Sequence, residues 1–122
     1  MSTISANDLQ NTSGGIPTVK GQRLIPTAWV NFDGTGTVSI RDSENVSSIT
    51  DEATGEYTVN FATAMANVTY GIAGAAGDRD YRINYRAYSA FPPTTTTVRV
   101  TIQSNSGVEV DDTGTLLVFG GQ

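Results

Sequence analysis

Apolar and polar residues alternate along most of the chain with a period of two. Val30 and Phe32 lie two apart before the turn-forming run Asp33-Gly34-Thr35-Gly36, and Val38 and Ile40 repeat this spacing after it. Successive side chains of a strand point to opposite faces of a sheet. The pattern therefore predicts a hairpin with one apolar face and one polar face.

A second hairpin is predicted directly after the first. Its second strand, residues 57–61, alternates apolar with polar residues (YTVNF) and follows a polar connection at 51–55. Its first strand is irregular, because Val46 and Ile49 are three apart. Either the two serines between them form a bulge, or only one of the two apolar side chains points inward. We expect the four strands to form one meander, whose apolar face something must cover.

Further alternating segments follow, separated by turns rich in Gly, Asp and Ser. They lie at residues 70–74, 81–88, 98–102, 108–110 and 115–119. Pro92 and Pro93 end the strand at 81–88, because proline cannot donate to a ladder. About eight strands at this spacing predict an all-β protein, an antiparallel β-sandwich.

Residues 1–26 differ from the rest of the chain. Their apolar residues are scattered without a sustained period of 2 or 3.6, and a Ser-Gly-Gly break and two prolines interrupt them. We expect an extended N-terminal arm at 1–26 and a sandwich at 27–122. An arm that buries so little is ordered only against a partner, such as neighbouring subunits or a larger particle. The alternative is an unstructured terminus.

Composition supports the prediction of β-strands and argues against several classes of function, among them nucleic-acid binding and catalysis. Val and Ile outnumber Leu, and Thr is the commonest residue, which favours strands. The net charge is −5 with a single lysine, so nucleic-acid binding is not expected. Neither a signal peptide nor a run of apolar residues that could span a membrane is visible, so no membrane insertion is expected. Without cysteine or histidine, we expect neither an enzyme nor a cofactor.

Two acidic turns are candidates for a metal ion, Asp33-Gly34-Thr35-Gly36 and Asp111-Asp112-Thr113-Gly114. Carboxylate and carbonyl oxygens in tight turns suit calcium. Neither turn has the spaced acidic series of an EF-hand, and ordinary turns also require Asp and Gly. No metal site is therefore expected. Paired carboxylates for glycoside cleavage are disfavoured too, because nearly all acidic residues fall in predicted turns.

The candidate binding residues lie on one face of the strand predicted at 81–88. Alternation places Arg82, Asn84, Arg86 and Tyr88 on the same side. Arg and Tyr offer forked donors and a ring face, which suit sugar hydroxyls or acidic partners. A solvated face with Asp–Arg pairs and a subunit interface are the open alternatives. Trp29 points away from the apolar face of its own strand, and we expect it in the core or an interface rather than in a ligand site.

Three runs near the start of the sandwich carry a family resemblance. They are AWVNFDGTGTVSIRD at 28–42, NVSSITD at 45–51 and GEYTVNF at 55–61. Together they resemble a domain of tail-fibre and other appendage proteins of bacteriophages and prophages, particularly marine and cyanobacterial ones. The opening, MST followed by QNTSGG at 10–15, is similar to the start of short fibre proteins of that group. The resemblance covers 28–61 and continues more weakly to about residue 75.

The resemblance implies a structural protein of the virion, assembled in the host cytoplasm. In this view a homotrimeric β-sandwich knob is anchored to other virion proteins by its N-terminal arm and attaches to the host surface, with a glycan as one receptor class. Trimerisation would also account for apolar residues on both faces of some strands. The alternative is a capsid or baseplate decoration protein without receptor binding. A bacterial carbohydrate-binding module is disfavoured by the missing secretion signal.

Overall fold

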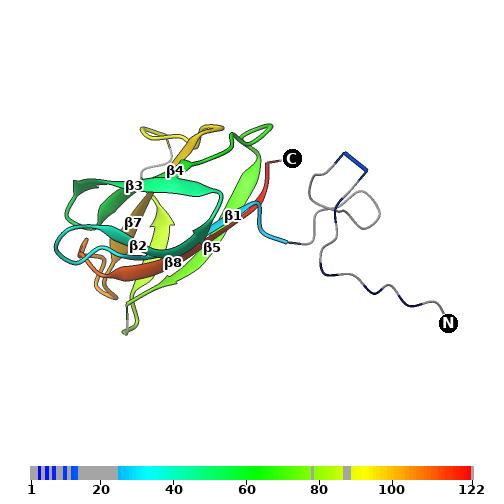
Figure 1. The fold of residues 1–122 in the computed structure, drawn as a ribbon. Coiled ribbons are helices and arrows are strands. Elements are labelled where there is room, and N and C mark those ends of the chain that lie inside the picture. Colours follow the sequence, from blue (N-terminus) through cyan, green and yellow to red (C-terminus); the bar gives the residue numbers. More distant parts are fainter. Residues whose placement is uncertain are drawn as a thin grey trace.

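A computed structural model describes residues 25–77, 79–86 and 89–121, with Thr3, Ser5, Asn7, Gln10, Thr12 and Ser13 before them. In this part the chain forms eight strands and no helix (Figure 1). The strands are β1 (Ala28–Asp33), β2 (Ser39–Glu44), β3 (Val46–Ala53), β4 (Glu56–Phe61), β5 (Tyr70–Ala76), β6 (Arg82–Tyr85), β7 (Thr97–Gln103) and β8 (Thr113–Gly120). No helix of the described part is long and apolar enough to cross a membrane.

The strands form two antiparallel sheets of four strands each. The first sheet has the order β2-β1-β8-β5, and the second has the order β3-β4-β7-β6. The two sheets lie face to face, and the chain enters and leaves the sandwich at the same end (Figure 1). The prediction of an all-β antiparallel sandwich with eight strands is confirmed.

The core lies between the sheets and is built from alternate positions of the central strands. It contains Ala28, Val30 and Phe32 from β1, Tyr57, Val59 and Phe61 from β4, Val98, Val100 and Ile102 from β7, and Leu116 and Val118 from β8. The rings of Phe32 and Tyr57 meet edge to face across the layers, with centroids 5.2 Å apart. The period of two in the sequence therefore identifies the residues that hold the two sheets together.

The predicted meander is wrong, because the chain changes sheets between the two hairpins. β1 pairs with β2 and β3 pairs with β4, but β2 and β3 belong to different sheets. Asn45, between them, has φ 56°, in the left-handed region that turns the chain sharply. Its Nδ2 donates to the carbonyl oxygens of Thr27 and Thr63, and its Oδ1 accepts from the Thr63 amide. This residue sets the corner of the sandwich.

The irregular strand β3 contains a bulge. Val46 pairs with Phe61 while Ser48 pairs with Asn60, so β3 has one more residue than β4 over this interval. Val46 and Ile49 both contact the core. Of the two alternatives left open by the sequence, the bulge is therefore correct.

Two predicted strands differ from the observed ones. Residues 108–110 form no strand; a single bridge joins Gln103 to Glu109, and Val108 is 60% exposed. The strand predicted at 81–88 runs only from Arg82 to Tyr85, and residues 87 and 88 lie outside the described part. Most of the predicted arm also lies outside it.

Candidate binding surfaces

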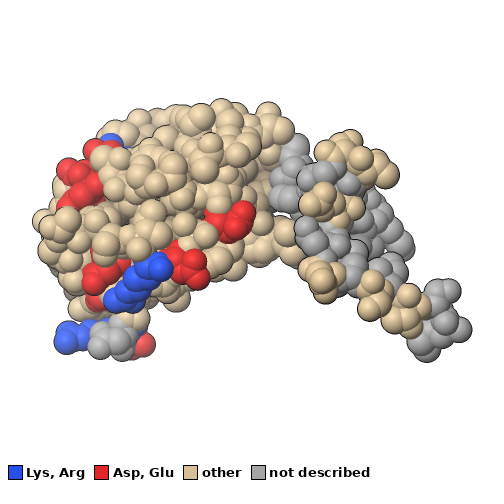
Figure 2. Space-filling model, in the orientation of Figure 1, with Lys and Arg blue, Asp and Glu red and all other residues tan. Residues whose placement is uncertain are grey.

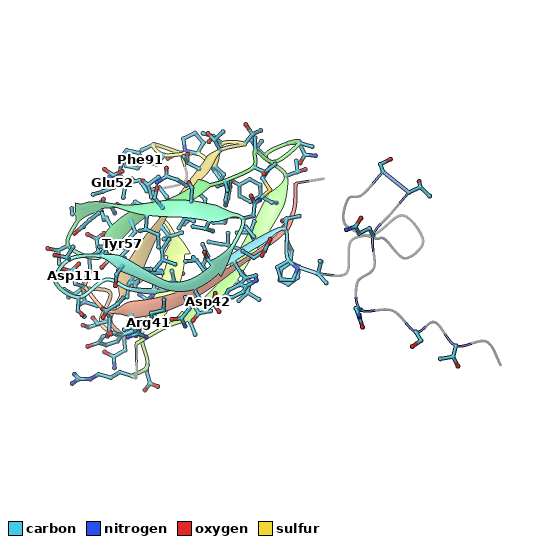
Figure 3. All side chains as sticks on the ribbon, viewed as in Figure 1. Arg41, Asp42, Glu52, Tyr57, Phe91 and Asp111 are labelled. Atoms are coloured by element: carbon cyan, nitrogen blue, oxygen red, sulfur yellow. The ribbon has the colours of Figure 1, made fainter. Side chains whose placement is uncertain are left out.

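The outer faces of the two sheets differ in chemistry. Figure 3 shows Phe91 on the side of the second sheet, and Arg41 and Asp42 on β2 at the opposite side of the sandwich. The outer face of the second sheet is polar, whereas the middle of the first sheet carries apolar side chains. Each face is therefore a separate candidate for contact with a partner.

Three of the four predicted binding residues lie near β6 on the polar face, and Tyr88 lies outside the described part. Arg82 Nε and Asn84 Nδ2 both donate to Oε1 of Gln103 on β7, at 3.3 and 3.4 Å. Arg82 is exposed and forms no ion pair with the residues that the structure describes. The structure thus brings Arg82 and Asn84 together through an amide that the sequence did not single out, and their role in binding stays a prediction.

Arg86 is part of an ion-pair network. Its Nη2 lies 2.7 Å from Oε1 of Glu56 and its Nη1 lies 2.9 Å from Oε1 of Glu109. Arg99 Nη2 contacts the second oxygen of Glu56 at 3.0 Å. Glu56 is only 7% exposed, so a buried carboxylate is neutralised by two guanidinium groups. Arg86 is thereby fixed in place, with its end groups already paired.

Phe91 is a feature of this face that sequence reasoning missed. The guanidinium carbon of Arg99 lies 3.9 Å from the centroid of the Phe91 ring. The ring is nevertheless 39% exposed. Alternation with Val98 and Val100 places Arg99 on the outer face, but no local pattern indicates that Phe91 folds back over it.

Three buried polar atoms in this region have no hydrogen-bond partner among the described residues. They are Nε of Arg86, Nε of Arg99 and Oγ1 of Thr101. Thr101 pairs with Glu56 on one side and with Asn84 on the other, so it lies between the ion-pair network and the amide group. Unpaired donors of this kind are the usual places for ordered water molecules.

The first sheet carries an apolar patch on its outer face. Trp29 on β1, Leu117 on β8 and Ala73 on β5 stand in one row across the sheet. In the next row Phe119, which is 45% exposed, lies beside Gly71. We call these five residues the outer apolar patch. Trp29 is half-buried on this face rather than in the core, which leaves the interface prediction open.

Charged side chains border this patch on the side of β2, where Glu44 pairs with Trp29. In Figure 2 they gather along β2 and at the end of the sandwich away from the N-terminal segment. Toward that end the outer face also becomes polar, and Asn31 Nδ2 donates to Oγ1 of Thr115 at 2.9 Å. The apolar area is therefore confined to the half of the sheet near the chain ends.

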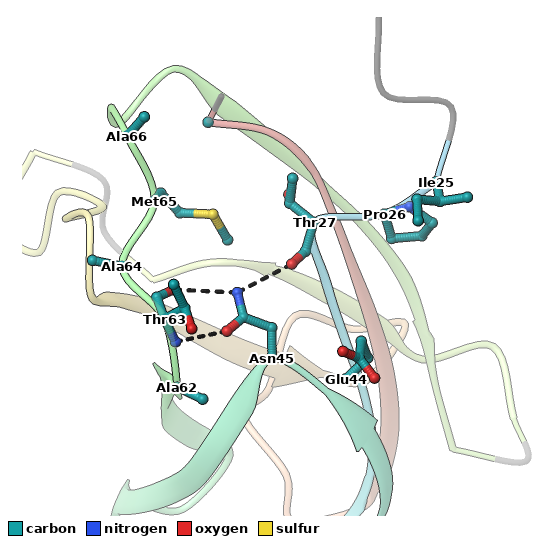
Figure 4. A pocket seen from close by; sticks show the side chains of 11 residues that line it. Ile25, Pro26, Thr27, Glu44, Asn45, Ala62, Thr63, Ala64, Met65 and Ala66 are labelled. Carbon is teal, nitrogen blue, oxygen red and sulfur yellow. Dashed lines mark hydrogen bonds between the residues drawn. The ribbon is translucent and has the colours of Figure 1, made fainter. Parts of the chain in front are cut away.

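A pocket of about 780 Å³ lies where the chain enters the sandwich. It is lined by Ile25, Pro26, Thr27, Glu44, Asn45, the segment 62–66 and Gly121. Figure 4 shows Asn45 at its centre, bonded to Thr27 on one side and Thr63 on the other. Ile25 is 53% exposed at its rim. The N-terminal segment thus joins the sandwich beside a largely apolar hollow.

The carboxylates of the two acidic turns are engaged by hydrogen bonds within the protein. Asp33 accepts hydrogen bonds from the hydroxyl and the amide of Thr35, which hold the pKa of Asp33 below its usual value. Asp111 accepts from Tyr57 Oη at 2.9 Å and from the Gly55 amide at 2.8 Å. Within the described part, no three His, Cys, Asp or Glu side chains come close enough to hold a metal ion.

Comparisons with known proteins place the chain near one solved structure. No family model matches it, and no curated protein matches its sequence. The fold is similar to part of a phage tailspike. That structure is the tailspike of phiAB6, solved with three-repeated oligosaccharides of Acinetobacter baumannii surface polysaccharide, with a TM-score of 0.46 and 14% identity. The alignment covers 98% of this chain and 30% of the tailspike.

Proposed function

We propose that the chain is a virion structural protein, a short phage fibre or fibre tip that assembles as a trimer and attaches the particle to the host surface. The observation that carries the proposal is the outer apolar patch. Trp29, Leu117 and Phe119 lie on the outer face of a rigid sheet, where a protein partner would remove them from water. The resemblance of residues 28–61 to appendage proteins supports a second copy as that partner.

The patch has two unequal halves, which suits contact between copies. The side chains on β1 and β8 are large, while those on the neighbouring strand β5 are Gly71 and Ala73. In a ring of three copies, the contact is heterologous: one part of the surface meets a different part of the next copy. Large side chains of one copy would then lie over the small residues of its neighbour.

The remaining surfaces have separate tasks in this proposal. The N-terminal arm joins the sandwich at one end, from where it can bind other virion proteins. The polar face of the second sheet stays accessible after trimerisation, because it lies on the opposite side of the sandwich. That face is therefore the one we assign to the host surface.

The first test is the mass in solution, measured by light scattering. We expect a trimer of three times 12.8 kDa for the full chain, and a trimer also for a form lacking residues 1–26, because every strand of the described part begins at Ala28 or later. Leu117→Glu should give a folded monomer, whereas Val68→Glu, at an apolar loop site that is 45% exposed, should not. If the full chain were a monomer, the proposed trimeric assembly would be wrong.

A second test separates host attachment from decoration. Deleting residues 1–26 should abolish incorporation into particles, while the purified sandwich should still bind host cells. Binding is followed with a fluorescently labelled protein. A chain that joins particles but never binds host cells would instead be a decoration protein.

A further inference from the structure

We propose that the polar face of the second sheet binds a carboxylated oligosaccharide along a strip formed by Phe91, Asn84, Gln103 and Arg82. The inference rests on the host-attachment role proposed above and adds the ligand class and the residues. The strip starts at an exposed aromatic ring and ends at the exposed guanidinium group of Arg82. Between them lie an amide pair and the fixed ion-pair network.

The register of β6 and β7 gives the order of groups along the strip. Arg82 pairs with Gln103, Asn84 pairs with Thr101, and the Arg86 amide donates to the Arg99 carbonyl oxygen at 3.0 Å. Residues two apart on one face of a strand are separated by about 7 Å, so Arg99 and Gln103 are about 13 Å apart. This is the length of a short oligosaccharide rather than of a single sugar.

Phe91 supplies a fixed stacking surface at one end. One face of its ring rests on the guanidinium of Arg99, and Glu56 holds that guanidinium in turn. The ring is therefore in place before a ligand arrives, which reduces the ordering cost of binding. Its exposed area is available to the apolar CH face of a sugar ring.

The amide pair supplies a donor and an acceptor side by side. Oε1 of Gln103 is already used by Arg82 and Asn84. Among the described residues, no hydrogen bond uses Nε2 of Gln103 or Oδ1 of Asn84. A sugar hydroxyl both donates and accepts, so neighbouring hydroxyl groups can engage both atoms.

The charge of the strip indicates an acidic ligand. Its two carboxylates, Glu56 and Glu109, pair with Arg86 and Arg99, so among the residues that the structure describes Arg82 has no carboxylate partner. This local positive charge occurs in a chain whose net charge is −5. A guanidinium fork matches a carboxylate, which places a uronic-acid type of sugar at the Arg82 end.

The test is calorimetric titration of the full-length protein with two probes, a trimer of galacturonic acid and the neutral trimer of galactose. The acidic probe should bind about tenfold more tightly than the neutral one. Arg82→Gln should remove that preference and leave the affinity for the neutral probe unchanged. Phe91→Leu, which keeps an apolar cover over Arg99 but removes the ring, should weaken both probes about tenfold.

A control variant on the other sheet accompanies this test. Arg41→Gln makes the same change on β2 of the other sheet, and it should leave both affinities as they are. The strip is not the binding site if neither probe binds. The same holds if Phe91→Leu leaves the binding of the probes intact. Equal affinity for the two probes overturns the carboxylated ligand. If any of these occurs while the trimer and host-cell binding persist, only this inference fails and the proposed function stands.

Discussion

At the scale of single residues, Tyr57 connects the core to the turns at one end of the sandwich. Its ring is fully buried against Phe32, and its hydroxyl donates to Oδ1 of Asp111 (Figure 3). Burial raises the pKa of Tyr57 well above its ordinary value of 10.0, and the hydrogen bond to Asp111 raises it further. The folded state therefore holds this proton more tightly than the unfolded state does.

A dependence of stability on alkaline pH follows from this shift. Because the folded pKa lies above the unfolded one, the contribution of Tyr57 is fully present below about pH 10 and is lost as pH rises above it. Tyr57→Phe should lower the free energy of unfolding by about 1 kcal/mol at neutral pH. The substitution should also make the fall of the unfolding free energy above pH 10 shallower. Urea denaturation at several pH values measures both, and identical slopes for the two proteins would contradict the assignment.

Glu56 is the residue on which the polar face depends. Glu56→Gln keeps the shape of the side chain but leaves the guanidinium groups of Arg86 and Arg99 without their shared carboxylate. We expect a loss of about 2 kcal/mol in unfolding free energy, because both arginines are only partly exposed. Glu52→Gln is the control, since Glu52 is exposed and accepts a hydrogen bond from Thr58 Oγ1. Thermal denaturation of both variants checks this, and equal losses would contradict a special role for Glu56.

At the scale of elements, the corner between β2 and β3 decides how two hairpins become two layers. Asn45→Gly keeps the left-handed backbone conformation but removes three side-chain hydrogen bonds. Asn45→Ala removes the bonds and also strains the backbone, so it should destabilise the sandwich by about 1 kcal/mol more than Asn45→Gly. Melting temperatures of the two variants give the comparison. If Ala were tolerated better than Gly, the left-handed conformation would not be what matters at this corner.

At the scale of the whole molecule, trimerisation should couple stability to protein concentration. Assembly through the outer apolar patch stabilises the folded state by mass action, so the melting temperature should rise as concentration rises. Leu117→Glu should abolish this dependence without changing the β-sheet signal in circular dichroism, because the Leu117 side chain points away from the core. Its neighbour Leu116 is fully buried, and Leu116→Ala should cost about 3 kcal/mol at any concentration. A concentration-independent melting temperature in the native chain would contradict assembly.

The strands and the faces of their side chains were predictable, because the alternation of apolar and polar residues within one strand shows which residues lie on each face. Alternation identified the inward residues of β1, β4 and β7, and the spacing of Val46 and Ile49 left a bulge in β3 as one of two alternatives. It also placed Arg82 and Asn84 on one face. Each of these inferences needs only neighbours within a few residues.

The sequence by itself therefore determined the class of the fold, most of its strands and, in the strands that alternate, which side chains face inward. Only the tertiary structure decided that the chain changes sheets at Asn45, that Glu56 joins Arg86 to Arg99, and that Phe91 covers Arg99. The physical reason is that these features depend on contacts between segments far apart in the sequence, such as Glu56 and Arg99, whose positions are 43 apart. A period of two tells which way a side chain points, but not which distant strand will lie beside it.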